Sequence, residues 1–225
     1  MANGHRSFGL GFCRVIPAEE WSRETPCPGF VCYQPRKGYR FGVEAYALAS
    51  FALDGGPVRS AVDLGTGSGI VALLLASQSV DVVAVERDER WRPMLERSVA
   101  ENGARVSVLW GDVRSLRLPA VDLVVSNPPW FDLRSGPVSP NDHKAHGRSM
   151  FFGGPADFVL AGLTAASRVC LVVPASTGLP DVAGTSLARR ARYGGLCLGE
   201  YRSGSGEPLD VPVDPYGRFR FPVAS

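Results

Sequence analysis

The sequence predicts an α/β protein with a doubly wound sheet of mostly parallel strands. From about residue 59 onward, short apolar runs alternate with segments of helical periodicity, the order expected of repeated β–α–β units. The apolar runs show no clean alternation of polar and apolar residues, which is typical of parallel strands covered by helices on both faces. A glycine-rich turn follows the first run, where such a sheet passes from strand to helix.

Length and composition fit one substantial domain. With 225 residues, 45% of them hydrophobic and 20% charged, the chain can bury a full core. The net charge of +2 does not by itself require a nucleic-acid partner, although a basic face could still exist. The first stretch, MANGHRSFGLGF, lacks the apolar segment of a signal peptide, and the longest apolar stretch, 70–76, is too short to span a bilayer. We therefore expect a cytoplasmic protein that does not enter a membrane.

The cysteines favour a reducing compartment and no metal site. They are odd in number and include no CxxC pair: Cys13, Cys27, Cys32, Cys170 and Cys197. Cys170 lies in the apolar run 168–173, where a packed free thiol is expected. His143 and His146 have no third candidate ligand nearby, so the sequence does not predict a zinc site.

The residues before the sheet are expected to form an extension and one helix. We place an N-terminal extension at 1–40 and a single domain at 41–225. The extension is rich in Gly, Pro and Cys, and only a short strand at 30–33 can be assigned in it. The segment 43–53 is apolar around much of its circumference and predicts a helix.

The first half of the sheet shows clear start and stop signals. Asp88 can cap a helix that runs to Glu101, and Asn102-Gly103 is a typical stop signal. Pro93 falls early in this helix, where its missing N–H costs least. The elements expected before this helix are a strand at 59–64, a helix at 69–77 and a strand at 81–86.

The second half is interrupted by a long irregular segment, 127–154. Gly154-Pro155 then opens a helix, with Pro in the first-turn position. The elements expected in this half are strands at 105–110 and 121–126, a helix at 154–167, a strand at 168–173, a weak helix at 180–193 and closing strands at 195–201 and 216–221.

The glycine-rich turn predicts a nucleotide site. It reads Val62-Asp63-Leu64-Gly65-Thr66-Gly67-Ser68-Gly69-Ile70 at the exit of the strand 59–64. Alternate glycines let the backbone turn sharply and approach a ligand with no side chain in the way. Nicotinamide binding is the chief rival, but the spacing is GxGxG and not the GxGxxG of dinucleotide folds.

Acidic residues stand at consecutive strand ends. Glu86 ends the strand 81–86, where a carboxylate can accept the hydroxyls of a ribose. Asp112 follows the strand 105–110 and can accept a hydrogen bond from an adenine amino group. Asp63 could orient the glycine turn or take the amino group of a methionine moiety. Chance would rarely put all three acids at successive strand ends.

A second loop, Asn127-Pro128-Pro129-Trp130, leaves the strand 121–126 at the edge where open α/β sheets bind ligands. The Asn carboxamide oxygen and the following backbone carbonyl can both accept hydrogen bonds from one NH2 group. The two prolines hold that carbonyl still because their φ angles are fixed. The indole of Trp130 can stack on a planar substrate. The loop therefore predicts a site for a planar amide or amine nitrogen.

The DLGTGSG stretch resembles motif I of class I S-adenosylmethionine-dependent methyltransferases, and Glu86 and Asp112 match that family's later acidic positions. The resemblance spans roughly 41–173. It implies a Rossmann-like sheet of seven strands with the last one antiparallel, and S-adenosylmethionine as cofactor. The candidate cofactor-binding residues are then Asp63, Gly65, Thr66, Gly67, Gly69, Glu86, Asp112, Val113 and Asn127.

The NPPW loop resembles the (N/D/S)PP(Y/F/W) motif of amino-methyltransferases, with Trp130 in place of the commoner Tyr. The stretch 33–49, which contains GYRFGVEAYALA, is similar to the segment before motif I in the tRNA1(Val) (adenine-N6)-methyltransferase family, with Glu44 where Asp is usual. This resemblance implies methylation of the N6 amino group of an adenine in tRNA. The catalytic candidates are Asn127, Pro128 and Trp130. The substrate-binding candidates are Tyr39, Arg40, Trp130 and Phe131.

Other methyl acceptors stay open, as does the oligomeric state. Members of the resembled group also methylate other DNA or RNA amino groups, or a glutamine amide of release factors. The release-factor enzymes usually carry a separate helical domain, which the segment 1–40 is too short to supply. A non-catalytic cofactor- or RNA-binding scaffold is a third hypothesis, which the retained acids and the intact NPPW loop oppose. The basic residues that could contact RNA phosphate are Arg36, Lys37, Arg40, His143, Lys144, His146 and Arg148.

Overall fold

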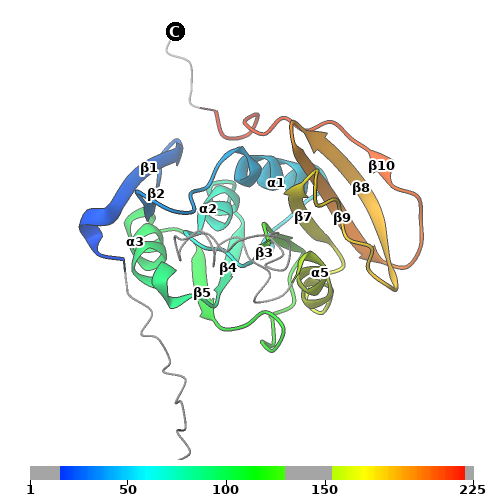
Figure 1. Cartoon of the computed structure of the whole chain (residues 1–225), viewed down its shortest axis with the longest axis horizontal. Coiled ribbons are helices and arrows are strands. Elements are labelled where there is room, and N and C mark those ends of the chain that lie inside the picture. The colour runs from blue at the N-terminus through cyan, green and yellow to red at the C-terminus, as the bar shows by residue number, and fades with distance from the viewer. Residues whose placement is uncertain (1–15, 130–153, 221–225) are drawn as a thin grey trace, which may run out of the picture.

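A twisted β-sheet forms the centre of the molecule (Figure 1). The computed structural model describes residues 16–129 and 154–220. Within those ranges the sheet has eight strands in the order β10-β8-β9-β7-β6-β3-β4-β5. The strands are β3 (Ser60–Leu64), β4 (Asp81–Glu86), β5 (Val106–Trp110), β6 (Leu123–Ser126), β7 (Val169–Pro174), β8 (Thr185–Tyr193), β9 (Leu196–Ser203) and β10 (Leu209–Asp210).

The strand directions confirm the predicted fold. β5, β4, β3, β6 and β7 run parallel to one another. β9 lies antiparallel between β7 and β8, so it is the antiparallel last strand of the Rossmann-like set of seven. β10 adds a two-residue parallel pairing at the outer edge of β8. The strand order reverses between β3 and β6, which is where open α/β sheets bind their ligands.

Helices cover both faces of the sheet because its strands are apolar on both sides. Ala61 of β3 belongs to one core, whereas Val62 and Leu64 belong to the other. The pleat thus explains the continuous apolar runs of the sequence. The helices of the first face are α1 (Val43–Asp54), α2 (Ile70–Ser77) and α3 (Arg92–Asn102), and α5 (Pro155–Leu163) covers the second. Two short 3-10 helices complete the set, η1 (Ala18–Glu20) and η2 (Glu89–Trp91), the latter capped by Asp88.

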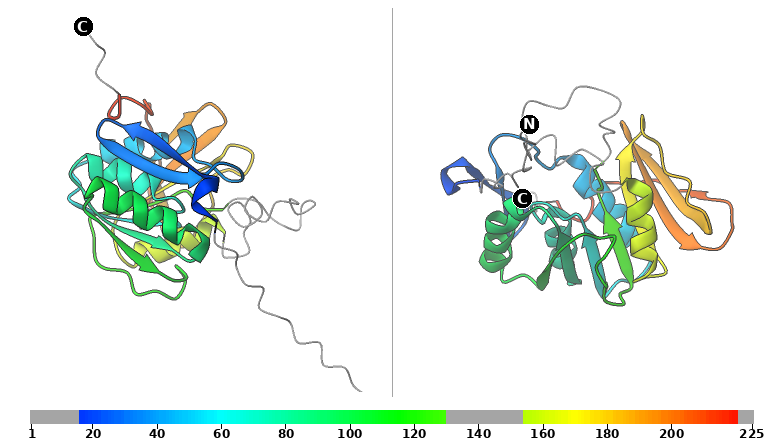
Figure 2. Two further views of the ribbon diagram at one scale, coloured as in Figure 1. Left: turned by 90° about the vertical axis from the view of Figure 1, so that its left-hand side faces the viewer. Right: turned by 60° about the horizontal axis from the view of Figure 1, so that its bottom comes forward.

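The N-terminal segment forms a β-hairpin that lies against α2 and α3 (Figure 2). β1 (Trp21–Cys27) pairs antiparallel with β2 (Phe30–Pro35), which confirms the strand at 30–33; β1 is absent from the prediction. Asn102 of α3 accepts a hydrogen bond from the N–H of Val31 at 2.7 Å and donates to its carbonyl at 2.6 Å. Ser98 accepts from the N–H of Tyr33 at 2.9 Å. Side chains of α3 therefore satisfy backbone groups of β2 that no strand pairs.

The C-terminal part differs from the prediction in two places. The weak helix predicted at 180–193 is wrong, because β8 occupies 185–193 and pairs along its length with β9. Tertiary pairing overrides the helix propensity of this Ala- and Arg-rich stretch. The closing strand predicted at 216–221 is also wrong, because residues 215–219 form turns. Phe219 is buried there and packs edge-on against Tyr46 of α1.

A buried carboxylate pairs with three arginines at the antiparallel end of the sheet. Glu200 of β9 is fully buried. It forms ion pairs with Arg202 at 2.6 Å, Arg189 at 2.8 Å and Arg168 at 3.4 Å. Burial alone would raise the pKa of Glu200, but the Arg202 hydrogen bond and the charges of Arg168 and Arg189 bring it below its ordinary value. Glu200 is therefore ionised in the fold.

The same arginines bind the C-terminal end of α1. Arg189 donates to the Phe51 carbonyl at 2.8 Å, and Arg168 donates to the Ala52 carbonyl at 2.9 Å. Cations are favoured at this end of a helix because its last carbonyls carry partial negative charge. Gly55 follows the helix at this point, and a Cβ on it would collide with both guanidinium groups. The cluster thus joins β9 to α1.

Replacing Glu200 with Gln is expected to lower the free energy of unfolding by about 3–5 kcal/mol, because it leaves the charges of the inner arginines uncompensated. Urea denaturation followed by circular dichroism measures the change. Asp210→Asn is the matched control, since Asp210 forms an exposed ion pair with Arg190 at 2.7 Å. The control is expected to leave the denaturation midpoint nearly unchanged. Equal midpoints for the two variants would show that the Glu200 cluster does not stabilise the fold.

Candidate active site

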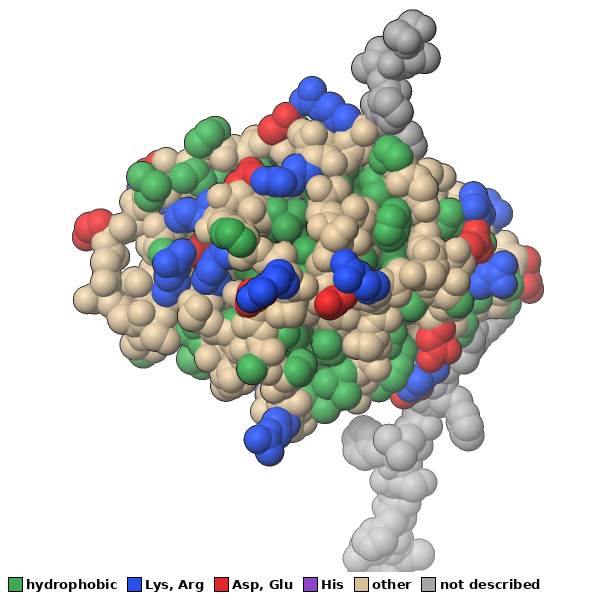
Figure 3. Space-filling view, turned by 180° about the vertical axis from the view of Figure 1, so that it is seen from behind, with side chains coloured by type: hydrophobic (Ala, Val, Ile, Leu, Met, Phe, Trp, Pro, Cys, Tyr) green, Lys and Arg blue, Asp and Glu red, His purple; other side chains and the backbone are tan. Residues whose placement is uncertain are grey.

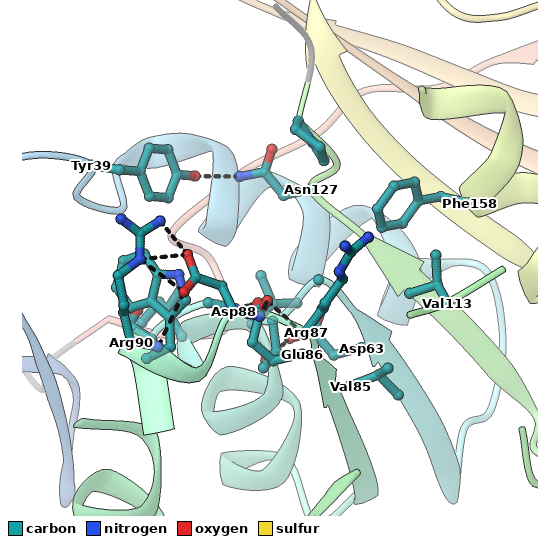
Figure 4. A pocket seen from close by; sticks show the side chains of 18 of the residues that line it. Tyr39, Asp63, Val85, Glu86, Arg87, Asp88, Arg90, Val113, Asn127 and Phe158 are labelled. Atoms are coloured by element: carbon teal, nitrogen blue, oxygen red, sulfur yellow. Dashed lines mark hydrogen bonds and ion pairs between the residues drawn. The ribbon is translucent and has the colours of Figure 1, made fainter. Parts of the chain in front are cut away.

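A pocket of about 320 Å3 opens at the carboxyl ends of β3, β4, β5 and β6 (Figure 4). This volume lies in the range of small-molecule sites. The sequence-predicted residues that line it are Tyr39, Asp63, Gly65, Thr66, Gly67, Glu86, Asp112, Val113 and Asn127. Gly69 and Pro128 are not part of the lining. The structure therefore brings the glycine turn, the strand-end acids and the Asn-Pro-Pro loop to one cavity.

The glycine turn presents backbone to the pocket. Gly65, Gly67 and Gly69 all adopt the left-handed region, with φ of 71°, 57° and 85°. A residue with a Cβ would be strained in this conformation. A Cβ on Gly65 would lie 3.2 Å from the ring of Phe158. A Cβ on Gly69 would lie 2.5 Å from Leu95 Cδ1, so the side chain of Leu95 in α3 would have to move.

Asp63 lies buried beneath the glycine turn. Its Oδ2 accepts hydrogen bonds from Thr66 Oγ1 at 2.5 Å and from the N–H of Ala72 at 3.1 Å. These contacts tie the turn to the first residues of α2, and of the two roles predicted for Asp63 they support orientation of the turn. Burial raises the pKa of Asp63 to about 7, against the lowering effect of these two hydrogen bonds.

Glu86 at the end of β4 already accepts three backbone N–H groups. Its Oε2 accepts from Gly67 at 2.8 Å. Its Oε1 accepts from Arg87 at 2.7 Å and from Asp88 at 2.8 Å. Burial raises the pKa of Glu86, and these hydrogen bonds oppose the rise. A carboxylate has about four acceptor positions, so Glu86 has room for one ribose hydroxyl while it supports the glycine turn.

Asp112, after β5, is held between two arginines. Its Oδ1 accepts from the backbone N–H and the Nε of Arg114, at 3.0 and 2.9 Å. Its Oδ2 accepts from Arg114 Nη2 at 2.6 Å and from Arg87 Nη1 at 2.7 Å. The hydrogen bond from the Arg114 guanidinium holds the pKa of Asp112 well below its usual range. These donors fill the carboxylate, so an adenine amino group could bind Asp112 only by displacing one of them.

Of the two arginines that donate to Asp112, Arg87 is the one that an adenine amino group could displace with the smaller loss of hydrogen bonds. Arg114 makes three of the four hydrogen bonds and Arg87 makes one. The side chains of Arg87 and Arg114 are 43% and 46% exposed, so water can solvate whichever guanidinium moves. The predicted contact between Asp112 and adenine therefore requires one of these donors to move, and Arg87 has the fewest hydrogen bonds to Asp112 to lose.

Asn127 follows β6 and points toward Tyr39 in the pocket (Figure 4). Its Nδ2 donates a hydrogen bond to the Tyr39 hydroxyl at 3.0 Å. Tyr39 comes from the segment between β2 and α1, and Pro129 lines the pocket next to Asn127. Trp130 and Phe131, the predicted stacking residues, lie outside the described residues.

Arg40 does not line the pocket, although the sequence predicts it as a substrate-binding residue. Its guanidinium donates to the Ser22 hydroxyl at 2.8 Å and to the Pro35 carbonyl at 3.1 Å. It also forms an ion pair with Glu24 at 2.6 Å. The structure thus places Arg40 against the hairpin, where it fixes the segment that carries Tyr39. The basic residues predicted between 143 and 148 lie outside the described residues.

The pocket also contains residues that the sequence analysis does not identify. Trp91 of η2 is buried and lies edge-on to Tyr39, with ring centroids 6.4 Å apart. Phe158 of α5 is buried and lines the opposite part of the pocket (Figure 4). Arg90 is only 6% exposed and forms an ion pair with Asp88. No local pattern marks the two aromatic residues, because aromatic residues at helical spacing usually belong to the core.

Within the residues that the structure describes, no helix is long and apolar enough to cross a membrane. Among the same residues, no group of three His, Cys, Asp or Glu side chains could hold a metal ion. The cysteines described are buried free thiols: Cys27, Cys32, Cys170 and Cys197.

Known proteins share the segment that builds the pocket. Residues 47–136 match the family model of the methyltransferase small domain. The tRNA1(Val) (adenine(37)-N6)-methyltransferase of Tolumonas auensis is 36% identical over 106 residues, which cover 44% of this chain and 43% of that protein. The ribosomal protein L11 methyltransferase of Desulfitobacterium hafniense is 32% identical over 114 residues, which cover 48% of this chain and 36% of that protein. The chain thus spans less than half the length of each of these relatives.

A solved structure shares the fold. A candidate RNA methyltransferase from Pyrococcus horikoshii superposes with a TM-score of 0.53, covering 74% of this chain and 93% of that chain at 18% identity. The fold is the Rossmann-like fold of class I S-adenosylmethionine-dependent methyltransferases, and residues 47–136, which supply most of the pocket, are similar to the methyltransferase small domain. Within that class, the chain resembles the tRNA1(Val) (adenine-N6)-methyltransferases.

The pocket fits S-adenosylmethionine. The turn from Gly65 to Gly67 leaves backbone, and no bulky side chain, along one wall, so a ligand can approach closely. Glu86 and Asp112 present carboxylates at adjacent strand ends, which suits one ribose hydroxyl and, once a donor to Asp112 has moved, the amino group of an adenine. The similarity to methyltransferases supports the same cofactor.

The free energy of unfolding is expected to fall between about pH 4 and pH 7 because of Asp63. Its pKa rises from 3.8 to about 7 in the fold, so the fold favours the protonated acid. The stabilisation is complete below the ordinary pKa and is lost as the pH rises through 7, at no more than about 1.4 kcal/mol per pH unit. Asp63→Asn keeps an oxygen acceptor for Thr66 and Ala72 but cannot ionise. Urea titrations at pH 5 and pH 8 should show a smaller loss in the variant; equal losses would contradict a raised pKa.

Proposed function

We propose that the protein transfers a methyl group from S-adenosylmethionine to the N6 amino group of an adenine in RNA, with tRNA as the acceptor class. The observation that carries this proposal is the position of Asn127. It follows β6, lines the same pocket as Glu86 and Asp112, and has its amide nitrogen bound to Tyr39. The name of the relative from Tolumonas auensis supports tRNA as the acceptor.

The strand-end acids would hold the cofactor. Glu86 would accept a ribose hydroxyl, and Asp112 would accept the adenine amino group after Arg87 moves aside. Val113, at the same end of the pocket as Asp112, would border the adenine ring. When bound, S-adenosylmethionine supplies a methyl group on a positively charged sulfur. Asp63 and Thr66 keep the glycine turn in the shape that leaves space for it.

Asn127 and Pro128 would position the target nitrogen. The carboxamide oxygen of Asn127 and the backbone carbonyl of Pro128 can each accept a hydrogen bond from one NH2 group. The lone pair of an adenine amino group is delocalised into the ring, and two acceptors on its hydrogens favour a pyramidal nitrogen with an exposed lone pair. Neither acceptor is a strong base, so the proton stays on the nitrogen until the new bond has formed. Orientation of the nitrogen then supplies much of the rate.

Pro129 and Trp130 would enclose the target base. Pro129 lines the pocket, and Trp130 follows it in the chain, although Trp130 lies outside the described residues. The indole would stack on the plane of the base, and Phe131 would extend that apolar contact. A base must leave its stack to enter such a pocket, which favours a loop of folded RNA over a regular helix.

Phosphate contacts would come from segments near the pocket. On the face shown in Figure 3, Lys and Arg side chains are scattered and several lie beside Asp or Glu. Exposed arginines such as Arg190 and Arg218 pair with acids. Arg36 and Lys37 are exposed at the end of the hairpin, next to the segment that carries Tyr39. We infer that these two residues, with the basic residues between 143 and 148, contact the RNA backbone.

We also propose a division of the chain into a domain and an extension. We assign the methyltransferase domain to 41–225 and an extension to 1–40. The hairpin formed by β1 and β2 belongs to this extension and packs against α2 and α3. The extension therefore supports the pocket wall from which Tyr39 projects.

A glutamine side-chain amide of a protein is the second candidate acceptor. A planar amide presents to Asn127 and Pro128 the same NH2 group that adenine does. The Desulfitobacterium hafniense relative, named for ribosomal protein L11, shows that a protein-directed methyltransferase matches this chain at an identity close to that of the tRNA-directed one.

Asn127→Ala is expected to lower kcat for methyl transfer by about 100-fold or more, because the reacting nitrogen loses an acceptor that matters in the transition state. Cofactor affinity, measured by isothermal titration calorimetry, should stay nearly the same. Glu86→Ala is the contrasting variant and should weaken cofactor binding, since it removes the ribose acceptor and the support of Gly67. A normal turnover number for Asn127→Ala would exclude the proposed mechanism.

The methyl acceptor can be identified by incubating the protein with S-adenosylmethionine that carries a labelled methyl group, together with separate pools of tRNA, rRNA, DNA and protein. We expect label in the tRNA pool and, after digestion to nucleosides, on N6-methyladenosine. Label that enters only the protein pool would select the glutamine amide instead. Label in no pool, from protein that binds the cofactor, would support the scaffold hypothesis.

A further inference from the structure

Tyr39 and Asn127 meet in the pocket although they are 88 positions apart in the chain. The carboxamide Nδ2 of Asn127 lies 3.0 Å from the Tyr39 hydroxyl. Figure 4 shows the two side chains pointing toward each other across the pocket. The contact therefore links the segment before the glycine turn to the loop that carries the proposed catalytic residues.

The backbone around Tyr39 is fixed from several directions. Gln34 is only 2% exposed, and its Oε1 accepts a hydrogen bond from the N–H of Phe41 at 3.1 Å. The guanidinium of Arg40 bonds to three groups of the hairpin. The ring of Tyr39 packs edge-on against the buried Trp91. The hydroxyl of Tyr39 is thus placed by structure that does not depend on Asn127.

The orientation of the Asn127 amide decides what the pocket offers to a substrate. A carboxamide has an acceptor, Oδ1, on one branch and a donor, Nδ2, on the other, and a half-turn about its last torsion exchanges them. A target amino group is itself a donor. An amide with Nδ2 turned toward it would therefore face it with a second donor and form no hydrogen bond. In the structure Nδ2 donates to the Tyr39 hydroxyl. Because a phenol hydroxyl can both donate and accept, this bond holds the carboxamide in place in the pocket but does not by itself choose between the two orientations.

We propose that Tyr39 is a positioning residue, whose hydroxyl holds the Asn127 carboxamide in place beside the amino group to be methylated. This inference rests on the proposed function and adds to it a role for the hairpin. β1 and β2 act on the reaction through Gln34 and Arg40, which fix the segment that carries Tyr39.

Tyr39→Phe tests the proposal, because it removes the hydroxyl and retains the ring that packs on Trp91. With tRNA as acceptor, kcat is expected to fall about three- to tenfold, the range that the net free energy of one hydrogen bond supplies. KM for tRNA and the Kd for S-adenosylmethionine should not change. Tyr33→Phe is the matched control, because the Tyr33 hydroxyl bonds to Glu101 at 2.7 Å, outside this pocket. An unchanged kcat for Tyr39→Phe, or a change confined to KM or Kd, would overturn the proposal.

A second measurement reports on the amide itself. The side-chain NH2 resonances of Asn127 can be assigned in 15N-labelled protein by their loss in Asn127→Asp. Loss of the hydrogen bond should make these protons exchange faster with water in Tyr39→Phe, and leave them unchanged in Tyr33→Phe. Equal exchange rates in the wild type and in Tyr39→Phe would show that Tyr39 does not hold the amide.

A double-mutant cycle separates the contact with Asn127 from the packing of the Tyr39 ring. Asn127→Ala removes the carboxamide that Tyr39 holds, so adding Tyr39→Phe should lower the residual kcat by a much smaller factor than in the wild type. An equal factor in both backgrounds would assign to Tyr39 a merely structural role.

The outcomes distinguish the two proposals. A wild-type protein that methylates no tRNA would remove the proposed function, and with it the catalytic meaning of the contact between Tyr39 and Asn127. A wild-type protein that methylates tRNA, with a Tyr39→Phe variant of equal kcat, would remove the role of Tyr39 alone.

Discussion

The glycine turn is held by hydrogen bonds to the carboxylates of Asp63 and Glu86, which lie at the ends of two neighbouring strands. Left-handed glycines have no side chain to hold their shape, and a buried N–H group needs an acceptor. Asp63 binds Thr66 and the first turn of α2, and Glu86 binds Gly67. The pocket wall, the start of α2 and the position of the neighbouring strand ends all follow from this arrangement.

The parallel part of the fold could be predicted from the sequence because its signals are local. Continuous apolar runs, an acidic cap at Asp88 and the stop signal Asn102-Gly103 each report on one element, and the structure places β3 to β7 where these signals indicate. β8 and β1 could not be predicted in the same way. Each pairs in a hairpin with the strand that follows it, β2 or β9, and its own composition does not show that pairing. The Ala- and Arg-rich composition of β8 favours a helix until β9 is available.

The candidate site shows the same division. Glu86, Asp112 and Asn127 could be assigned to one pocket because the carboxyl ends of parallel strands share an edge. Their partners depend on packing between distant segments: Arg87 on Asp112, and Tyr39 on Asn127. The number of acceptor positions still open on a carboxylate could not be predicted from the sequence either. A motif marks a carboxylate as a possible ligand, but only the structure shows which of its acceptor positions are already taken.

The insertion of β9 between β7 and β8 has a consequence for the growing polypeptide. β7 is synthesised before β8, but the strand that covers its outer edge, β9, comes after both. Until residues 196–203 have left the ribosome, β7 presents an unpaired edge whose residues from Val169 to Val173 are buried in the folded protein. Bare apolar edges recruit other strands and promote aggregation. The solubility of the nascent chain thus depends on how promptly its late strands emerge, although the pocket is formed by β3 to β6.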